Sequence, residues 1–303
     1  MRHLIIGGGI AGTTTAEELR KRDPSAHITL VCEEHDPLYS RVLLPHYLKG
    51  KVSRDRVFLK KESWYGQQRI EWLHGTRASH LDARNKFVGL SDGREMSYDK
   101  LLIAMGGEPR LLDEEPHGVS HLRTLADADH LLELIAQARV KRGGIYGSGF
   151  IACEYINLFA HFGIPTVLAH RGTHFFSRAL MPEAGELIAR HLADHGVETH
   201  AQTQLLSLEG GHELTAVKTR KGEHACEVLG VGIGIVPDFE WLRAGGVETG
   251  VGVKGNEYLE TNVPDIYVAG GVAEFFDPVT GRQLVMCNWM NAMSQGRVVA
   301  RTM

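Results

Sequence analysis

Two glycine-rich segments have the spacing that lets a backbone approach a phosphate closely. In the first, Gly7, Gly9 and Gly12 form a G-x-G-x-x-G pattern, and residues 147–152 repeat it with alanine in the third position. The first glycine permits a tight turn, the second lets a pyrophosphate approach the main chain, and the third lets a helix pack against a strand. Backbone N–H groups at the start of that helix then bind the phosphates. Each segment therefore predicts a dinucleotide-binding turn.

Charged residues follow each turn at the place where such sites select their nucleotide. Glu33 comes after the first turn, and a carboxylate there accepts hydrogen bonds from the ribose hydroxyls of a dinucleotide. After the second turn, which has Gly147 and Gly149, the corresponding place holds His170 and Arg171. Arginine offers a fork of donors that matches a 2′-phosphate, so this pair favours NADPH over NADH. The alternative, in which both side chains only face solvent, stays open.

Each turn must lie between a strand and a helix, and the flanking sequence predicts these elements. Short apolar runs predict buried strands, and longer runs after each turn predict helices. We expect strands over residues 4–6, 27–32, 144–146 and 165–169, and helices over residues 13–22 and 153–162. This order, repeated twice, predicts an α/β fold with two Rossmann-like dinucleotide-binding domains.

The composition of the 303-residue chain agrees with two globular domains. Its net charge of −4 argues against a nucleic-acid partner, because such proteins usually carry a basic surface. No apolar run reaches the roughly 18 residues that a membrane span needs, and no signal-peptide pattern precedes the first strand. The cysteines are widely separated, and we assign none of the 17 histidines to a metal. We therefore expect a cytoplasmic protein with reduced cysteines, without a membrane partner and without a metal.

Two dinucleotide sites in one chain suggest hydride transfer, in which one nucleotide delivers a hydride and the other receives it. Further segments of interest are YSRVLLPHYLKGK (39–51), LLIAMGGEPR (101–110), VGIGIVPD (231–238), YLETNVPDIYVAGGVAE (258–274) and NWMNAMSQGRVVARTM (288–303). Together with the glycine turns, these segments resemble the pyridine nucleotide-disulfide oxidoreductases, flavoproteins with two dinucleotide sites. The chain is most similar to the flavin module of NAD(P)H-nitrite reductases and of the related rubredoxin and ferredoxin reductases.

The resemblance implies a particular division of the chain into domains. An FAD-binding domain would be built from residues 1–112 and 237–303, with an NAD(P)-binding domain of residues 113–236 inserted between them. A first long helix is implied within residues 39–51, and a final helix of the FAD-binding domain within residues 288–303. Larger relatives continue into an interface domain. We expect no such domain here, and no siroheme or iron–sulfur segment.

The resemblance also implies roles for individual residues. Phe150 matches an aromatic residue that covers the nicotinamide pocket, and Glu154 matches a carboxylate on the same helix near the flavin. Ordinary helix packing and a solvated acid are the alternatives for these two. Arg41 matches a cation near the cofactor, and Ala78 a backbone contact to adenine. The positions implied to bind a cofactor, either FAD or NADP or NAD, are Gly7, Gly9, Ala11, Gly12, Glu33, Glu34, Arg41, Ala78, Ala104, Gly106, Gly271, Val272, Gly147, Gly149, Ile151, His170, Arg171 and Gly234.

Some positions depart from the family pattern. Relatives have aspartate at the position of Gly271, and its carboxylate accepts a hydrogen bond from a ribityl hydroxyl of FAD. We expect this turn to join a strand to a helix that begins near Val272, and we expect weaker FAD binding because the carboxylate is absent. Met105, where relatives have threonine, is a second departure. Val42 lies where some relatives have a redox-active cysteine, so disulfide chemistry is not expected.

These observations predict a flavoprotein oxidoreductase that passes a hydride from NAD(P)H to FAD, and then electrons to a separate acceptor, without a redox-active disulfide. A small redox carrier protein is a candidate partner. One alternative is an NAD(P)H oxidase or diaphorase, whose flavin reacts with oxygen or quinones. Another is a degenerate, non-catalytic nucleotide-binding protein, which Gly271 and Met105 favour and the two intact turns oppose.

Overall fold

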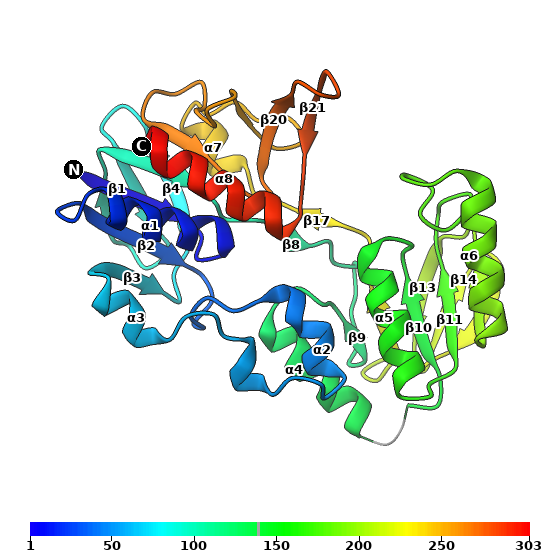
Figure 1. Ribbon diagram of the computed structural model, residues 1–303. Helices are drawn as coiled ribbons and strands as arrows, with labels where there is room; N and C mark the ends of the chain where they lie inside the picture. The colour runs from blue at the N-terminus through cyan, green and yellow to red at the C-terminus, as the bar shows by residue number, and fades with distance from the viewer. Residues whose placement is uncertain (138–139) are drawn as a thin grey trace. The chain divides into compact units, whose positions relative to one another are not determined.

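The chain packs into two compact units, each with a parallel sheet of its own (Figure 1). The computed structural model describes residues 1–137 and 140–303. Unit 1 comprises residues 1–40, 58–107 and 237–303, and unit 2 comprises residues 41–57 and 108–236.

The units differ from the expected domains at two short segments. Residues 41–57, expected in the FAD-binding domain, group with unit 2, where Tyr47 and Arg54 both contact Asp129. The Tyr47 hydroxyl donates to the Asp129 carboxylate at 2.6 Å, and Arg54 forms an ion pair with it at 3.0 Å. Residues 108–112 also group with unit 2. The assignment of FAD to one unit and of the nicotinamide nucleotide to the other remains a prediction.

The parallel sheet of unit 1 has the strand order β19-β7-β1-β2-β3 and is buried on both faces. Because successive side chains of a strand point to opposite faces, Leu4 and Ile6 pack into one apolar cluster, whereas Ile5 packs into another. Burial on both faces is typical of parallel sheets. The strands are β1 (Arg2–Ile6), β2 (His27–Cys32), β3 (Ile70–His74), β7 (Lys100–Ile103) and β19 (Ile266–Val268).

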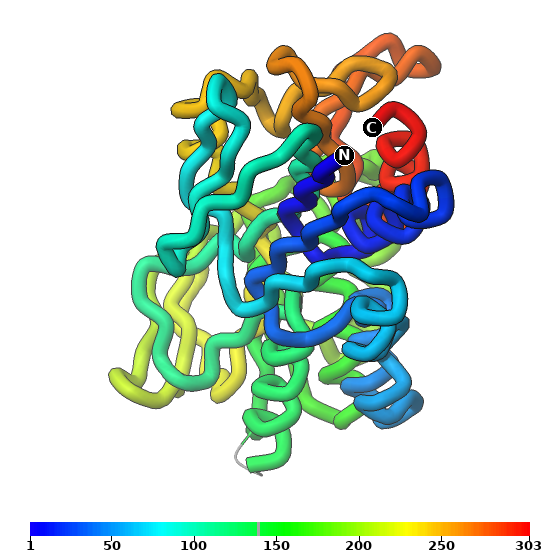
Figure 2. Tube along the Cα trace, turned by 90° about the vertical axis from the view of Figure 1, so that its left-hand side faces the viewer, coloured from blue at the N-terminus to red at the C-terminus, as the bar shows by residue number. Residues whose placement is uncertain are grey.

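Helices α1 (Ile10–Arg22) and α8 (Trp289–Thr302) lie side by side on the Ile5 face of this sheet (Figures 1 and 2). The first and last helices of the chain are therefore neighbours. Their approach is close because α8 presents Gly296: the Thr15 hydroxyl donates to its carbonyl oxygen at 3.0 Å and to that of Ala11 at 2.9 Å.

Smaller elements complete unit 1. Strands β4 (Ala78–Asp82), β5 (Phe87–Leu90) and β6 (Glu95–Ser97) form one sheet, and β18 (Val253–Gly255), β20 (Ala273–Asp277) and β21 (Arg282–Val285) form another; α3 (Glu62–Gln67) and α7 (Glu240–Ala244) are short helices. The expectation of a helix that begins near Val272 was wrong, because strand β20 begins directly after this residue. Pairing with β18 on one side and β21 on the other explains the extended conformation.

Unit 2 has a parallel sheet of order β12-β11-β10-β16-β9. Its strands are β9 (Val119–Ser120), β10 (Gly143–Tyr146), β11 (Thr166–Ala169), β12 (Val197–His200) and β16 (Val228–Val231), and its helices include α4 (Leu125–Ala136), α5 (Phe150–His161) and α6 (Pro182–Asp194). Strands β13 (Leu205–Glu209), β14 (Ala216–Thr219) and β15 (Gly222–Ala225) form a separate antiparallel sheet, and β8 (Glu108–Pro109) pairs with β17 (Ile235–Val236).

The segment 39–51 does not form the long helix that was expected. It contains the 3₁₀ turn η1 (Arg41–Leu43) and the short helix α2 (Leu44–Leu48), and η2 (Arg54–Val57) follows. Gly50 has a φ of +66°, a left-handed conformation that ends a helix. The expected element was therefore wrong in length.

Across the described part of the chain, no helix is both long and apolar enough to cross a membrane.

We predict that Gly296→Ala lowers the free energy of unfolding by about 1–3 kcal/mol. A Cβ at this position would lie 2.5 Å from the Ala11 carbonyl oxygen, so the two helices would have to separate. Gly66→Ala is the matched control, because its Cβ meets no described heavy atom within 4 Å. That variant should be unchanged, or more stable by up to about 1 kcal/mol, because alanine favours helix. Urea unfolding of both variants provides the measurement, and equal losses would contradict this account of the helix contact.

Candidate nucleotide-binding sites

Most positions expected to bind FAD lie along one edge of the unit 1 sheet. Gly7 follows β1, Glu33 follows β2, Ala104 follows β7, and Gly271 comes three residues after β19. These strands are parallel neighbours, so their carboxyl ends share an edge. In open α/β sheets, ligands bind in the crevice outside that edge. The structure therefore brings together residues from both ends of the chain.

In the first glycine turn, backbone atoms leave no room for a side chain at Gly7 or Gly12, whereas the space beside Gly9 is open. Gly7 has a φ of +117°, and a Cβ there would lie 2.2 Å from the Ala104 carbonyl oxygen. A Cβ on Gly12 would lie 2.0 Å from the Gly7 carbonyl oxygen. At Gly9, by contrast, a Cβ would meet no heavy atom of the described chain within 4 Å. Gly9 caps α1, so the open side faces the first-turn N–H groups and fits an anionic diphosphate.

An arginine that sequence reasoning missed pairs with Glu33, one of the positions expected to bind FAD. Arg77 precedes Ala78 at the start of β4, and its guanidinium lies 3.6 Å from the Glu33 carboxylate and 3.5 Å from that of Asp238. Glu33 is 57% exposed and accessible to a ligand. The ion pair can fix the carboxylate for the ribose hydroxyls. The sequence offered one signal for Arg77, which is that it stands next to Ala78, a position expected to contact the cofactor.

Three other expected positions have defined surroundings. Glu34 accepts a hydrogen bond of 2.5 Å from the Tyr39 hydroxyl. Gly106, after β7, has a φ of +70°. Arg41 lies in unit 2, where its Nε donates to the Arg123 carbonyl oxygen at 3.0 Å. The role of Arg41 as a cation near the cofactor remains a prediction.

The turn that lacks the family carboxylate can accept a side chain. The left-handed residue there is Gly270, with a φ of +85°, and not Gly271. A Cβ on Gly271 would lie 3.5 Å from the Cys287 sulfur, which is ordinary contact, and that thiol donates to the Gly271 carbonyl oxygen at 3.3 Å. A Cβ on Gly270 would lie 3.2 Å from the Ala11 side chain, so the turn is next to the start of α1. The expected position Val272, which follows the turn, is fully buried.

The second glycine turn, in unit 2, repeats the first in its packing. Gly147 has a φ of +137°, and a Cβ there would lie 2.2 Å from the Gly232 carbonyl oxygen. Gly149 caps α5, and neither it nor Gly234 has a described heavy atom within 4 Å of a Cβ position. Ala152, in place of the third glycine, is completely buried. This turn also presents open helix N–H groups that fit a diphosphate.

The two expected catalytic residues share one face of α5. Phe150 is the first residue of the helix and is 81% exposed, and Glu154 comes one turn later on the same face. The Phe150 ring contacts that of Phe176 edge-on, with centroids 5.0 Å apart. The Phe176 N–H donates to the Ser148 carbonyl oxygen at 3.2 Å, which ties this loop to the glycine turn. Sequence reasoning gave Phe176 no role, and its aromatic character was the only signal. Ile151, also expected here, is partly exposed.

Of the two residues after β11 that were expected to be cations, His170 and Arg171, only Arg171 is available as one. His170 is only 2% exposed, and burial lowers its pKa, so the ring is neutral near neutral pH. Arg171 is exposed. The expectation that both side chains serve a 2′-phosphate as cations was therefore wrong for His170, whose burial follows from its packing beside Phe175.

Two of the four thiols are held protonated by their surroundings. Burial raises the pKa of Cys226 to about 12 and also raises that of Cys153, so these thiols stay protonated and unreactive. Val42, at the position where some relatives have a thiol, is exposed.

Comparisons of sequence point to one family. Residues 1–296 match the family described as pyridine nucleotide-disulphide oxidoreductase. The ferredoxin–NAD(+) reductase component of the anthranilate 1,2-dioxygenase system of Burkholderia cepacia is 30% identical, over 98% of this chain and 74% of that protein. An NADH oxidase of Methanocaldococcus jannaschii is 26% identical, over 99% of this chain and 69% of that protein.

Comparison of structures confirms the predicted α/β fold. Putidaredoxin reductase, in its covalent complex with putidaredoxin, superimposes with a TM-score of 0.93 at 28% identity. The match covers 99% of this chain and 74% of that one.

We predict that Gly271→Asp tightens FAD binding by about ten- to hundredfold, because a hydrogen bond to a charged group contributes about 1.5–3 kcal/mol. The backbone at Gly271 accepts a side chain without strain. No helix dipole assists, since β20 and not a helix follows. Fluorescence titration of the apoprotein with FAD provides the measurement.

Gly271→Asn is the matched control for charge, and it should tighten binding less, by about tenfold or below. If Gly271→Asp leaves the FAD affinity unchanged or weaker, the missing carboxylate is not what limits cofactor binding.

Proposed function

Because the chain belongs to the pyridine nucleotide-disulphide oxidoreductase family, we propose that it is an FAD-dependent NAD(P)H oxidoreductase that passes electrons to a separate acceptor. Membership of this family confirms the predicted enzyme class and the expected cofactors, FAD with NADP or NAD. FAD, when bound, supplies the capacity to take up a hydride from NAD(P)H and to release its electrons to an acceptor.

The observation that carries the proposal is the presence of two open backbone cradles in one chain. At Gly9 and at Gly149, the space beside the helix N-terminus is unobstructed, while neighbouring glycines hold each turn tightly. Each cradle binds an anionic diphosphate through N–H groups. We propose that unit 1 binds FAD, with Glu33 and Arg77 at the ribose, and that unit 2 binds the nicotinamide nucleotide.

The residues of α5 would control access to the nicotinamide. Phe150 projects into solvent with Phe176 against its edge, so it can cover a bound ring and exclude water. Glu154, on the same face, can position a polar group of the nucleotide. We assign no redox role to Cys153 or Cys226, because burial holds both thiols protonated.

A small redox carrier protein is the acceptor that we propose. Support comes from the relative named as a ferredoxin–NAD(+) reductase and from the structural neighbour complexed with putidaredoxin. The relative named as an NADH oxidase supports the second candidate, in which oxygen is the acceptor. We also propose a cytoplasmic location, which the wide separation of the four cysteines in the sequence supports, because cytoplasmic proteins keep cysteines reduced.

A turnover experiment tests this function. We expect the chain purified without added flavin to release FAD and not FMN when its cofactor is extracted and analysed by mass, and the apoprotein to bind added FAD. NAD(P)H should bleach the flavin absorption without oxygen, and a ferredoxin or rubredoxin should accelerate NAD(P)H oxidation more than oxygen or a quinone does. Equal rates with oxygen and carrier would favour an oxidase. Failure to bind FAD would favour a non-catalytic nucleotide-binding protein.

The donor preference depends on one exposed cation. We predict that Arg171→Ala raises KM for NADPH about tenfold or more, and KM for NADH little, because one charge-assisted contact contributes about 1.5–3 kcal/mol. Arg190→Ala, at an exposed position of α6, is the control for the change in net charge. Steady-state kinetics with both donors provide the measurement, and equal effects on the two KM values would remove the basis for an NADPH preference.

A further inference from the structure

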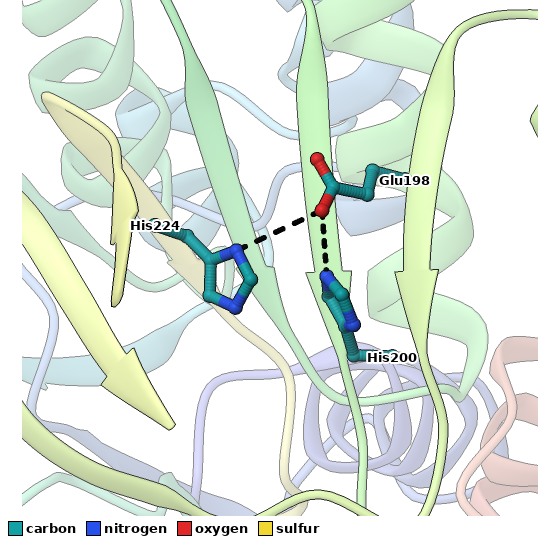
Figure 3. A group of neighbouring side chains, drawn as sticks. All are labelled: Glu198, His200 and His224. Atoms are coloured by element: carbon teal, nitrogen blue, oxygen red, sulfur yellow. Dashed lines mark hydrogen bonds and ion pairs between the residues drawn. The ribbon is translucent and has the colours of Figure 1, made fainter. Parts of the chain in front are cut away.

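Glu198, His200 and His224 form a cluster of potential metal ligands within unit 2 (Figure 3). Glu198 and His200 stand two residues apart on β12, so their side chains leave the same face of the strand. His224 comes from β15, in the small antiparallel sheet. Each residue offers one ligand atom, and these atoms all lie within 4.8 Å of one another.

The distances suit a shared ion. Glu198 Oε1 lies 2.9 Å from His200 Nε2 and 3.8 Å from His224 Nδ1. Zinc binds nitrogen and oxygen ligands at about 2.0–2.2 Å, so two ligand atoms of a tetrahedral site lie roughly 3.3–3.5 Å apart. The observed separations lie on either side of this value. The third separation, between the two histidine nitrogens, is within 4.8 Å, so side-chain rotations would bring the three atoms around one ion in place of the present hydrogen bond between His200 and Glu198.

The hydrogen bonds of His224 indicate which ring nitrogen is available. The Thr219 hydroxyl donates to the Gly222 carbonyl oxygen at 3.1 Å, and its oxygen lies 3.4 Å from His224 Nε2. Because the single hydroxyl proton is already donated, Thr219 accepts from Nε2–H of the neutral ring. The lone pair of Nδ1 then faces the Glu198 carboxylate, as in Figure 3. A cation between these two atoms would be attracted by both, and a hydrogen bond from the other ring nitrogen is typical of metal-bound histidine.

The surroundings hold the carboxylate and leave one side open. Arg142 contacts the other Glu198 oxygen, Oε2, at 3.2 Å, which leaves Oε1 facing the two imidazoles. The His200 and His224 side chains are 19% and 10% exposed, whereas Glu198 is 45% exposed, so solvent can reach the cluster from one side.

We propose that Glu198, His200 and His224 bind one Zn²⁺ ion, with water in the fourth position. Imidazole ligands favour zinc over magnesium or calcium, which prefer all-oxygen sites. The ion would tie β12, the edge strand of the parallel sheet, to β15 of the neighbouring antiparallel sheet. This site departs from the expectation that none of the histidines binds a metal, and it is independent of the nucleotide chemistry proposed above.

The test is zinc binding by the full chain after treatment with a chelator. Titration with zinc chloride, in competition with a chromophoric zinc indicator, should give one ion per chain for the wild type. His224→Gln, His200→Gln and Glu198→Gln should each weaken binding by at least about tenfold, since loss of even a supporting contact costs about 10- to 100-fold. Cobalt(II) provides a second readout, because its intense visible absorption in a four-coordinate site should appear in the wild type and be lost in His224→Gln.

Two histidines of unit 2 supply the matched control. His191 and His195 stand one turn apart at the end of α6, with ring centroids 4.3 Å apart. The His191 carbonyl oxygen accepts a hydrogen bond of 2.8 Å from His195 Nδ1. His191→Gln should leave the zinc affinity unchanged. The proposal is overturned if the wild type binds no stoichiometric zinc, or if His191→Gln abolishes binding while His224→Gln does not. Circular dichroism of each variant checks that it is folded, and zinc should raise the Tm of the wild type but not that of His224→Gln.

Discussion

Close backbone contact at the two glycine turns is the constraint on which both units depend. A side chain at Gly12 would overlap the Gly7 carbonyl oxygen, and a side chain at Gly147 would overlap that of Gly232. Backbone atoms in a packed sheet cannot yield as a flexible side chain can. In unit 1 this contact holds the end of β1 against α1, and in unit 2 it holds the end of β10 against the end of β16. The orientation of the first-turn N–H groups follows from this packing, so phosphate binding requires no charged side chain in the turn itself.

The sequence predicted the elements around these turns well, because their signals are local. The strand expected over residues 27–32 is β2, and the helix expected over residues 13–22 lies inside α1, which starts three residues earlier. The earlier start reflects the capping role of glycine, since the helix begins directly after Gly9. Apolar strands buried on both faces, each followed by a glycine turn, leave few alternative folds.

Where the sequence failed, long-range contacts decided the structure. A glycine turn before an apolar stretch is compatible with a helix or a strand, and two pairing partners made Ala273–Asp277 a strand. Residues 41–57 group with unit 2 through contacts with Asp129, which lies far along the sequence. His170 was expected to contact a phosphate because of its residue type and its place after the strand, but tertiary packing buries its side chain.

The candidate sites show the same division. The glycines and Glu33 were predictable because each belongs to a motif with fixed spacing. Arg77 and Phe176 were missed because their importance comes from a partner, Glu33 in one case and Phe150 in the other, that only the folded chain brings near. The same holds for His224, which reaches Glu198 and His200 from a strand of another sheet.

The adjacency of α1 and α8 has a consequence for biosynthesis. Unit 2 is nearly continuous in sequence, so it can begin to fold while the ribosome is still adding residues. Unit 1 cannot be completed until α8 has emerged, because that helix covers the apolar face that α1 shares with it. At a synthesis rate of about 5–20 residues per second, the interval between the two helices is on the order of tens of seconds. During that time the nascent first unit exposes apolar surface that α8 later buries, and such surface is prone to aggregation.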